Sequence, residues 1–449
     1  MRAASFTSEV VLPVGASDAY AWHARPGAFE RLVPPWERLS VRSRTGGLED
    51  GAEVTLELRA GPFRRTWVAR HHDVTPGRSF ADTMERGPFA AWTHVHRFLD
   101  DEGGCRLRDE VTYRLPFGPL GRVAAPLVRR KLDRTFAFRH RRLAHDLERH
   151  AMTTTPLRIA VTGASGLVGS ALTSLLTTGG HQVLRLTRSP ARDGDIAVAR
   201  DGTVADPAAL EGVDAVVHLA GENIGKRWTE ERKREIERSR VEGTQALVSA
   251  LGSLARPPRV LVSASAVGIY GDRGAELLTE SSVPGDDFLA GVCRRWEAAA
   301  NEATASGIRV VTPRFGVVLE ALLHRLLRPF RLGVGGPVGS GRQWLSWVAL
   351  DDLVSAVLFA IVTDELTGPV NVVAPGIVTN RELARTLGRV LRRPAVLPLP
   401  AAAARLALGE LADGLLLASQ RVTPVVLTEA GYRFAYPTLE GALRHVLGR

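Results

Sequence analysis

The sequence predicts two domains, an α+β domain built on an antiparallel sheet and then an α/β domain built on a doubly wound parallel sheet. Before residue 151, short apolar-polar alternations are separated by glycine-rich turns, as in half-buried antiparallel strands. After residue 156, apolar runs alternate with stretches of helix length, as in a parallel sheet covered on both faces. The polar stretch 151–156 ends in a proline and predicts the linker between the domains.

Composition limits the classes of protein to consider. With 45% hydrophobic and 24% charged residues, the chain is neither disordered, collagen-like nor a disulfide scaffold. The net charge is +10, but we expect the basic cluster at 129–142 to be a solvated helix face and not a nucleic-acid surface. No segment reaches the roughly 18 apolar residues of a membrane-spanning helix. Two distant cysteines predict free thiols and a cytoplasmic protein.

The first domain, expected at 1–150, reads in the order strand, helices, antiparallel meander and long terminal helix. We expect the first strand at about 5–12, a helical stretch at 20–32 and the closing helix at about 120–149. Within the meander, Val54, Leu56 and Leu58 alternate with polar residues, which predicts a strand with one buried face.

The second domain is expected at 157–390, with parallel strands at 158–161, 183–186, 214–219, 260–262 and 310–311. A helical C-terminal extension is expected at 391–449. Its alanine- and leucine-rich stretch at 401–417 predicts a packed helix.

A glycine-rich turn follows the first strand of the second domain and leads into a helix. Gly163 allows the tight turn, Gly166 lets the main chain approach a pyrophosphate, and Gly169 lets the helix pack closely on the strand. The start of the helix offers unpaired N–H groups and partial positive charge to phosphates. We therefore expect a dinucleotide to contact Gly163, Ser165, Gly166, Leu167, Val168 and Gly169.

The next strand indicates which dinucleotide binds. An NAD site usually ends this strand with an acidic residue for the ribose hydroxyls, whereas an NADP site places arginine there for the 2′-phosphate. The strand ends in Thr187 and Arg188, and no carboxylate appears before Asp193. NADP(H) is therefore favoured over NAD(H), although Arg188 can also be one more arginine in an arginine-rich chain.

From residue 157 to 449 the sequence resembles the extended or atypical short-chain dehydrogenase/reductases. It resembles in particular the sugar-nucleotide-epimerase-like branch, the NAD-dependent epimerase/dehydratase proteins, with its distinctive C-terminal domain. The matching motifs lie at 161–169, 219–224, 226–229, 239–240, 263–272, 328–343 and 371–375. The resemblance implies a Rossmann fold in which Thr187 and Arg188 contact the adenosine phosphate. It also implies cofactor contacts from Leu219, Ala220, Gly221, Glu235 and Arg240.

Short-chain reductases transfer a proton through a tyrosine whose pKa of about 10 is lowered by a lysine four residues later. None of the five tyrosines in this chain has a lysine at that spacing. By the same resemblance, Ser265 is a candidate hydrogen-bond donor to a substrate carbonyl. Tyr270 is a candidate substitute proton donor, or it packs a loop. Arg314 can steer an anionic substrate group or pair with a surface carboxylate.

The first domain resembles the START-like or SRPBCC helix-grip fold, including polyketide-cyclase/dehydrase-type proteins. That resemblance implies a curved sheet around the long helix and a cavity for a lipid-like or aromatic ligand. Candidate wall residues, each of which can instead fill the core, are Trp22, Trp36, Trp67, Trp92, Phe98 and Phe136.

Histidines in the first domain are the remaining candidates for metal ligands. His94 and His96 project from one face of a strand, and His71 and His72 precede a turn. A metal site needs three or four converging ligands, and nothing in the sequence marks a third. We therefore expect no metal site.

Three classes of function remain. The first is an NADP-dependent oxidoreductase or epimerase-like enzyme for a small-molecule substrate, to which the tethered first domain delivers an apolar ligand. The second is a nucleotide-sensing protein that kept the cofactor site and lost the chemistry. In the third, the first domain is the active partner and the second is a scaffold. The missing tyrosine-lysine pair argues against ordinary dehydrogenase chemistry but not against cofactor binding.

Overall fold

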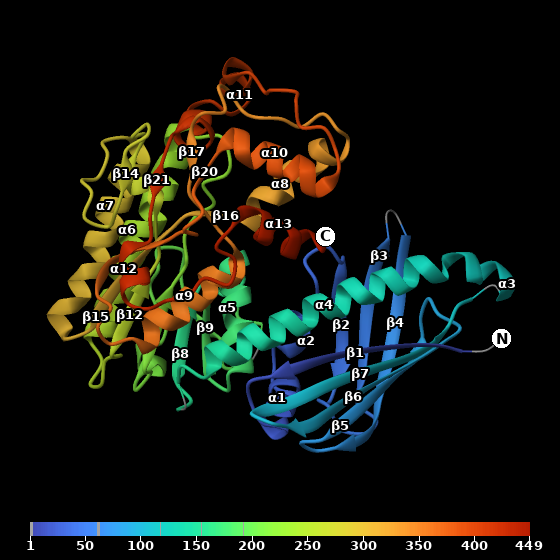
Figure 1. Ribbon diagram of the computed structural model, residues 1–449. Coiled ribbons are helices and arrows are strands. Elements are labelled where there is room, and N and C mark those ends of the chain that lie inside the picture. Colours follow the sequence, from blue (N-terminus) through green and yellow to red (C-terminus); the bar gives the residue numbers. More distant parts are fainter. Residues whose placement is uncertain (1–2, 61–62, 117, 154, 192) are drawn as a thin grey trace. The chain divides into compact units, whose positions relative to one another are not determined.

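A computed structural model describes residues 3–60, 63–116, 118–153, 155–191 and 193–449 of the chain. The chain divides into two compact units: Met1–Thr154 makes up most of the first, and Thr155–Leu176 with His181–Arg444 makes up the second. The first has an antiparallel sheet and the second a parallel one, which confirms the predicted fold class (Figure 1). In the described part of the chain, no helix is long and apolar enough to cross a membrane.

The first unit is built on a seven-stranded antiparallel sheet in the order β1-β7-β6-β5-β4-β3-β2 (Figure 1). Its strands are β1 (Ala4–Leu12), β2 (Leu39–Thr45), β3 (Glu53–Ala60), β4 (Phe63–Thr75), β5 (Ser79–Arg86), β6 (Ala91–Asp101) and β7 (Gly104–Arg114). Strands β2 to β7 neighbour one another in chain order, which is the predicted meander, and β1 pairs with β7 at its far edge.

The helices of this unit differ from the prediction in two places. They are α1 (Ala16–Ala24), α2 (Ala28–Leu32), α3 (Gly118–Gly121) and α4 (Ala125–His150), and a 3₁₀ turn at Arg122–Ala124 precedes α4. The helix predicted at 20–32 is interrupted, because Pro26 disfavours helical geometry at Arg25 and Gly27 adopts a φ of 93°. The closing helix α4 begins five residues later than the predicted position 120.

Helix α4 buries one of its faces against the sheet. Leu132, Phe136, Leu143 and Leu147 recur at intervals of four or seven residues, which places them on one helix face, and they belong to the core of the sheet. Asp146, on the same helix, forms a fully buried ion pair with Arg31, with 2.7 Å between Nε and Oδ2. The helix therefore closes this core through both apolar and charged contacts.

The basic cluster on α4 is only partly the solvated face that we expected. Arg129, Arg130 and Arg141 are exposed, as predicted. Arg142 is buried, with its guanidinium 4.8 Å from the centre of the Phe138 ring. The prediction is wrong for Arg142, because an arginine stem packs well along apolar surface.

The second unit is built on a parallel sheet in the order β10-β9-β8-β11-β12-β15, with β19 on the far side of β15. These strands are β8 (Arg158–Thr162), β9 (Gln182–Thr187), β10 (Ile196–Ala197), β11 (Ala215–His218), β12 (Val260–Ser263), β15 (Arg309–Phe315) and β19 (Gly368–Val372). A short strand β13 (Ser265–Ala266) pairs with the end of β15. The strand order reverses between β8 and β11, where doubly wound sheets bind ligands.

Helices and small two-stranded pairings complete the second unit (Figure 1). The helices are α5 (Leu167–Thr178), α6 (Glu230–Gly252), α7 (Phe288–Asn301), α8 (Leu319–Arg331), α9 (Leu350–Val362), α10 (Asn380–Leu391), α11 (Ala401–Leu408), α12 (Val425–Glu429) and α13 (Leu439–Leu447). The pairings join β14 (Leu277–Leu278) to β21 (Arg421–Val422), β16 (Val317–Val318) to β18 (Trp347–Val348), and β17 (Trp344–Leu345) to β20 (Val378–Thr379).

The C-terminal stretch 391–449 contains more than the helices expected there. Strand β21 pairs with β14, so the stretch as far as Arg444 is part of the α/β unit and not a purely helical addition. The helix predicted at 401–417 ends at Leu408, where Gly409 has a φ of 63°, and a π-helical turn follows at Ala412–Leu417.

Candidate functional site

The glycine-rich turn after β8 lies directly against the loop after β11. Gly163 has a φ of 68°, and a Cβ atom there would lie 2.8 Å from the carbonyl carbon of Leu219. A Cβ atom at Gly169 would lie 2.2 Å from the carbonyl oxygen of Gly163. Only glycine allows backbone to approach this closely at both positions, as we expected for a dinucleotide turn.

Thr162 joins the two strand ends at this crevice. Its hydroxyl oxygen accepts hydrogen bonds from the backbone N–H groups of Leu219 and Ala220, each at 3.1 Å. Because that oxygen already accepts two hydrogen bonds, the Thr162 O–H group donates one to Nδ1 of His218, at 2.7 Å. With Nδ1 accepting this bond, the proton of neutral His218 lies on Nε2. The same hydroxyl holds the backbone of Leu219 and Ala220, two of the predicted cofactor contacts, at the crevice.

Buried His218 predicts a loss of stability in acid. Burial lowers the pKa of His218 to about 4, below its usual 6.5, so below about pH 6.5 the unfolded chain binds the proton more readily than the folded one. The stabilisation is complete above about pH 6.5 and is lost as the pH falls toward about 4. The free energy of unfolding that depends on this proton is about 3 kcal/mol.

We expect the free energy of unfolding, measured with denaturant between about pH 7 and pH 4, to fall less steeply with pH in His218→Gln than in the wild type. Equal pH dependence in the two proteins would contradict this assignment of His218.

The remaining predicted nucleotide contacts lie around the same crevice. Ser165, Gly166 and Leu167 are exposed at the start of α5, where the helix has its partial positive charge. Arg188 is exposed at the end of β9. Burial raises the pKa of Glu222, in the loop after β11, but hydrogen bonding to Arg232 and the charge of Arg188 bring it below its usual value. Arg188 at the end of β9 is therefore close enough to Glu222, in the loop after β11, for their charges to interact.

Helix α6 supports the loop after β11. Arg240 donates a hydrogen bond to the carbonyl oxygen of Glu222, at 3.0 Å, and its guanidinium lies 5.0 Å from the centre of the Trp296 ring. Glu235 forms an ion pair with Arg232, at 3.0 Å, and Arg232 also binds the Glu222 carboxylate at 2.6 Å. Both α6 residues expected at the cofactor thus belong to the contacts that hold this loop.

Ser265 and Tyr270 belong to one buried polar network. The Ser265 hydroxyl donates to Oε1 of Glu297, at 2.6 Å, and Glu297 accepts two hydrogen bonds from Arg314, each at 2.8 Å. Arg314 also donates to the hydroxyl of Tyr270, at 2.9 Å, and that hydroxyl donates to Oδ1 of Asn371, at 2.7 Å. The network connects the ends of β13, β15 and β19 with α7.

This network tests the alternatives for two residues. Tyr270 is 0% exposed and its hydroxyl is fully engaged, which favours the packing role over that of a proton donor. Burial raises the pKa of its phenol, although Arg314 opposes the shift. Arg314 pairs with the partly buried carboxylate of Glu297, which is neither of the two alternatives, an anionic substrate group or a surface carboxylate.

Cys293 and Glu297 have the spacing of the missing tyrosine-lysine pair. They lie four residues apart on α7, and Glu297 accepts the hydrogen bond from Ser265. Burial raises the pKa of the Cys293 thiol to about 12, so the thiol stays protonated at neutral pH. We did not identify either residue from the sequence, although their i, i+4 spacing was a usable signal.

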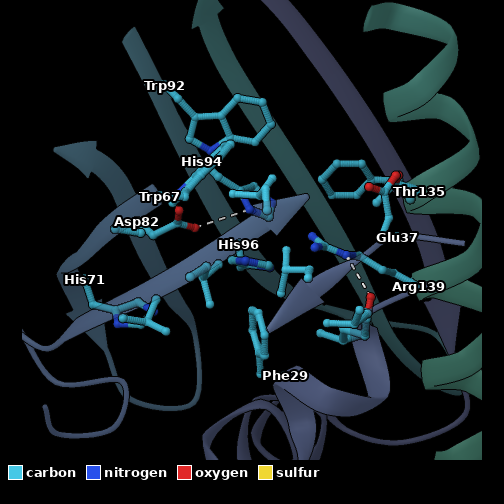
Figure 2. A pocket seen from close by; sticks show the side chains of 18 of the residues that line it. Phe29, Glu37, Trp67, His71, Asp82, Trp92, His94, His96, Thr135 and Arg139 are labelled. Atoms are coloured by element: carbon cyan, nitrogen blue, oxygen red, sulfur yellow. Dashed lines mark hydrogen bonds and ion pairs between the residues drawn. The ribbon is translucent and has the colours of Figure 1, made fainter. Parts of the chain in front are cut away.

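The first unit contains an open cavity of about 1060 Å³ between the sheet and helices α2 and α4 (Figure 2). Trp67, Trp92 and Phe136 line it, as predicted for wall residues. Trp22 and Phe98 instead fill the core. Trp36 packs edge-on against Phe138, with ring centres 5.1 Å apart.

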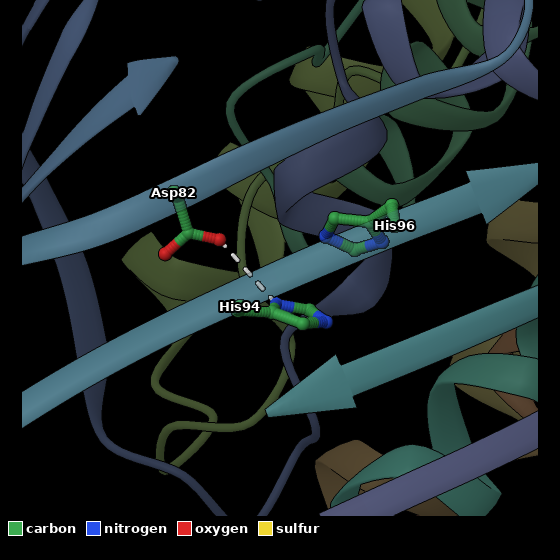
Figure 3. Close-up of side chains that lie close together, drawn as sticks. All are labelled: Asp82, His94 and His96. Carbon is green, nitrogen blue, oxygen red and sulfur yellow. Dashed lines mark ion pairs between the residues drawn. The ribbon is translucent and has the colours of Figure 1, made fainter. Parts of the chain in front are cut away.

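Polar side chains gather at one part of this cavity. Asp109, which is 2% exposed, accepts hydrogen bonds from Nε2 of His94 at 3.0 Å and Nε2 of His140 at 2.6 Å. The sequence marks no third candidate ligand beside His94 and His96, but the structure brings the Asp82 carboxylate together with them. Oδ2 of Asp82 lies 3.3 Å from Nδ1 of His94 (Figure 3). His71 also lines the cavity, whereas Nε2 of His72 is bonded to the Thr83 hydroxyl.

Comparisons with known proteins agree with this geometry. Residues 159–373 match the NAD dependent epimerase/dehydratase family, and residues 399–446 match a domain of unknown function. An epimerase family protein from Mycobacterium bovis is 42% identical over 296 residues, which are 65% of this chain and 98% of that protein. The chain belongs to the NAD-dependent epimerase/dehydratase family. In this epimerase-family chain, residues 12–139 match a second family, polyketide cyclase / dehydrase and lipid transport, which confirms the resemblance of the first domain.

Solved structures resemble the epimerase-family chain over one or both units. A crystal structure described as the nucleoside-diphosphate sugar epimerase from Corynebacterium glutamicum is 36% identical, with a TM-score of 0.80. The match covers 99% of this chain and 90% of that one. The human epimerase family protein SDR39U1, crystallised with NADPH, is 36% identical with a TM-score of 0.59, over 65% of this chain and 99% of that one.

Proposed function

We propose that the second unit binds NADP(H) between β8 and β11 and acts on a small molecule as an oxidoreductase or epimerase. The close backbone approach at Gly163 and Gly169 carries this proposal, because it leaves open the space that a pyrophosphate needs. The crystal structure of the human relative with NADPH supports it. When bound, the nicotinamide supplies a site for hydride transfer.

Each part of the crevice has a role in this proposal. The turn residues Gly163, Ser165, Gly166, Leu167, Val168 and Gly169 hold the pyrophosphate. Thr187 and Arg188 hold the adenosine 2′-phosphate, and Leu219, Ala220 and Gly221 line the opposite wall. Glu235 and Arg240 act through the loop after β11, which their contacts stabilise.

The hydrogen-bond direction at Ser265 limits what it can offer a substrate. Because its O–H donates to Glu297, its oxygen is available to accept a proton from a substrate hydroxyl. Donation to a substrate carbonyl requires the hydroxyl to turn away from Glu297. In this position, Ser265 suits a substrate that presents an alcohol.

A second candidate function is an NADP(H) sensor without hydride chemistry. Cys293 and Glu297 have the spacing of the missing tyrosine-lysine pair, but Arg314 pairs with the Glu297 carboxylate. A screen with deuterium-labelled NADPH over carbonyl compounds and nucleotide sugars separates the two functions. Label transfer that Ser265→Ala abolishes supports the enzyme, whereas tight NADPH binding without transfer to any compound supports the sensor.

Arg188 decides the choice of cofactor in this proposal. We expect Arg188→Ala to weaken NADPH binding by about 10- to 100-fold, because it removes a charge-assisted hydrogen bond to the 2′-phosphate. NADH binding should change less than about twofold, since that phosphate is absent. Arg259→Ala is the control, because Arg259 precedes β12 at the other end of the strands. Equal losses for both nucleotides in Arg188→Ala, measured by calorimetric titration, would overturn the assignment.

A further inference from the structure

Three side chains converge in the cavity of the first unit with the spacing of metal ligands. Asp82 lies on β5, directly across from His94 on β6, and His96 projects from the same face two residues later. Their potential ligand atoms, one from each residue, all lie within 4.8 Å of one another (Figure 3). Antiparallel register therefore assembles two imidazoles and a carboxylate on rigid strands, where they also line the cavity (Figure 2).

Asp109 lies behind these residues and orients them. It accepts the Nε2 proton of His94, which turns Nδ1 of the same ring toward Asp82, 3.3 Å from its Oδ2. Asp109 is itself held by His140 from α4, at 2.6 Å. A carboxylate that accepts the second N–H of a histidine is the usual support for a metal-binding imidazole.

His96 completes the set from beside His94. The two ring centres are 3.9 Å apart, close enough for both imidazoles to reach one ion. His96 is only 8% exposed, and its Nδ1 lies 2.7 Å from Asp109 without the alignment of a hydrogen bond. A buried imidazole with an unsatisfied nitrogen is costly unless a partner binds it.

We propose that Asp82, His94 and His96 bind a divalent first-row transition metal ion such as Zn²⁺ or Fe²⁺, with Asp109 as the orienting residue. Two histidines and one carboxylate suit these ions and leave coordination positions open. The open positions face the cavity, so they take water or the carbonyl or hydroxyl oxygen of an otherwise apolar ligand. This site is separate from the proposed nucleotide function, because it lies wholly within the first unit.

Titration of the full chain with Zn²⁺ and Co²⁺ tests the proposal. The protein carries no polyhistidine tag and is first treated with a chelator. We expect about one equivalent of each ion to bind, Co²⁺ to develop visible absorption, and the metal to raise the melting temperature. Asp82→Asn and His94→Gln should abolish these changes, and Asp109→Asn should weaken binding by about 10- to 100-fold. His72→Gln is the matched control and should bind like the wild type.

The isosteric variant Asp82→Asn keeps the shape of the site, and circular dichroism reports whether it is folded. Absence of Zn²⁺ and Co²⁺ binding to the wild type would overturn the proposal. Binding that survives in folded Asp82→Asn and His94→Gln would overturn it as well, because the ion would then lie elsewhere. Neither result affects the NADPH titration of the second unit, so the two proposals fail independently.

Discussion

Replacing Gly169 with alanine is expected to lower NADPH affinity by about 100-fold and to destabilise the protein by about 1–3 kcal/mol. The new Cβ atom would lie 2.2 Å from the carbonyl oxygen of Gly163 and 2.8 Å from Cα of Ala164. Both are backbone atoms, so no side chain can rotate away. The whole turn must shift, and the phosphate contacts that depend on its backbone shift with it. Calorimetric titration measures the first effect, and denaturant unfolding measures the second.

Gly243→Ala is the control for this substitution. Gly243 lies within α6, and the nearest atom to an added Cβ is 3.9 Å away, so alanine fits. We expect unchanged nucleotide affinity and a gain of about 0.5–1 kcal/mol in stability, because alanine restricts the unfolded chain more than glycine does. If Gly169→Ala behaved like Gly243→Ala, the crevice between β8 and β11 would not be the nucleotide site.

Removing the charge of Glu297 is expected to lower stability more than the Gly169 substitution does. In Glu297→Gln the guanidinium of Arg314, which is 6% exposed, loses its two-pronged carboxylate partner. An unpaired buried charge costs about 3–5 kcal/mol. Denaturant unfolding of the variant gives the size of the loss.

A double-mutant cycle separates the interaction energy of Glu297 with Arg314 from the general damage that each substitution does to the core. Arg314→Met removes the second charge, so the double variant is expected to be more stable than the sum of the two single losses predicts. Glu440→Gln is the control, because the ion pair of Glu440 with Arg389 is solvent-exposed and its loss should have no measurable effect. Additive losses for Glu297 and Arg314 would show that the two charges are not coupled.

The geometry of the crevice proposed for the nucleotide could be predicted from the sequence because its requirements are local. Gly163 and Gly169 lie within seven consecutive residues, and their role follows from the strand before them and the helix after them. Arg188 ends the next strand, so it too could be placed. The interruption between α1 and α2 is equally local, since Pro26 and Gly27 are visible in the sequence. The prediction of one helix at 20–32 follows the apolar pattern instead of these two residues, and it is wrong for that reason.

The polar clusters could not be predicted, because their members meet only in the folded chain. Glu297 and Arg314 lie on α7 and β15, and nothing in the sequence specifies which side chains face each other across that packing. Asp82 meets His94 through the register of β5 and β6. A shift of one residue in that register would turn Asp82 to the other face of the sheet. The face shared by His94 and His96 was predictable, but their carboxylate partner was not.

The large cavity of the first unit has a thermodynamic consequence (Figure 2). Its walls are mainly apolar, and a molecule that fills it removes those walls from contact with water. Transfer of apolar surface out of water lowers the heat capacity, so the enthalpy of binding becomes more negative as the temperature rises. A small polar molecule held only by Asp82 and the histidines would lack this slope. Calorimetry at several temperatures can therefore sort the occupants of the cavity by class before any of them is identified.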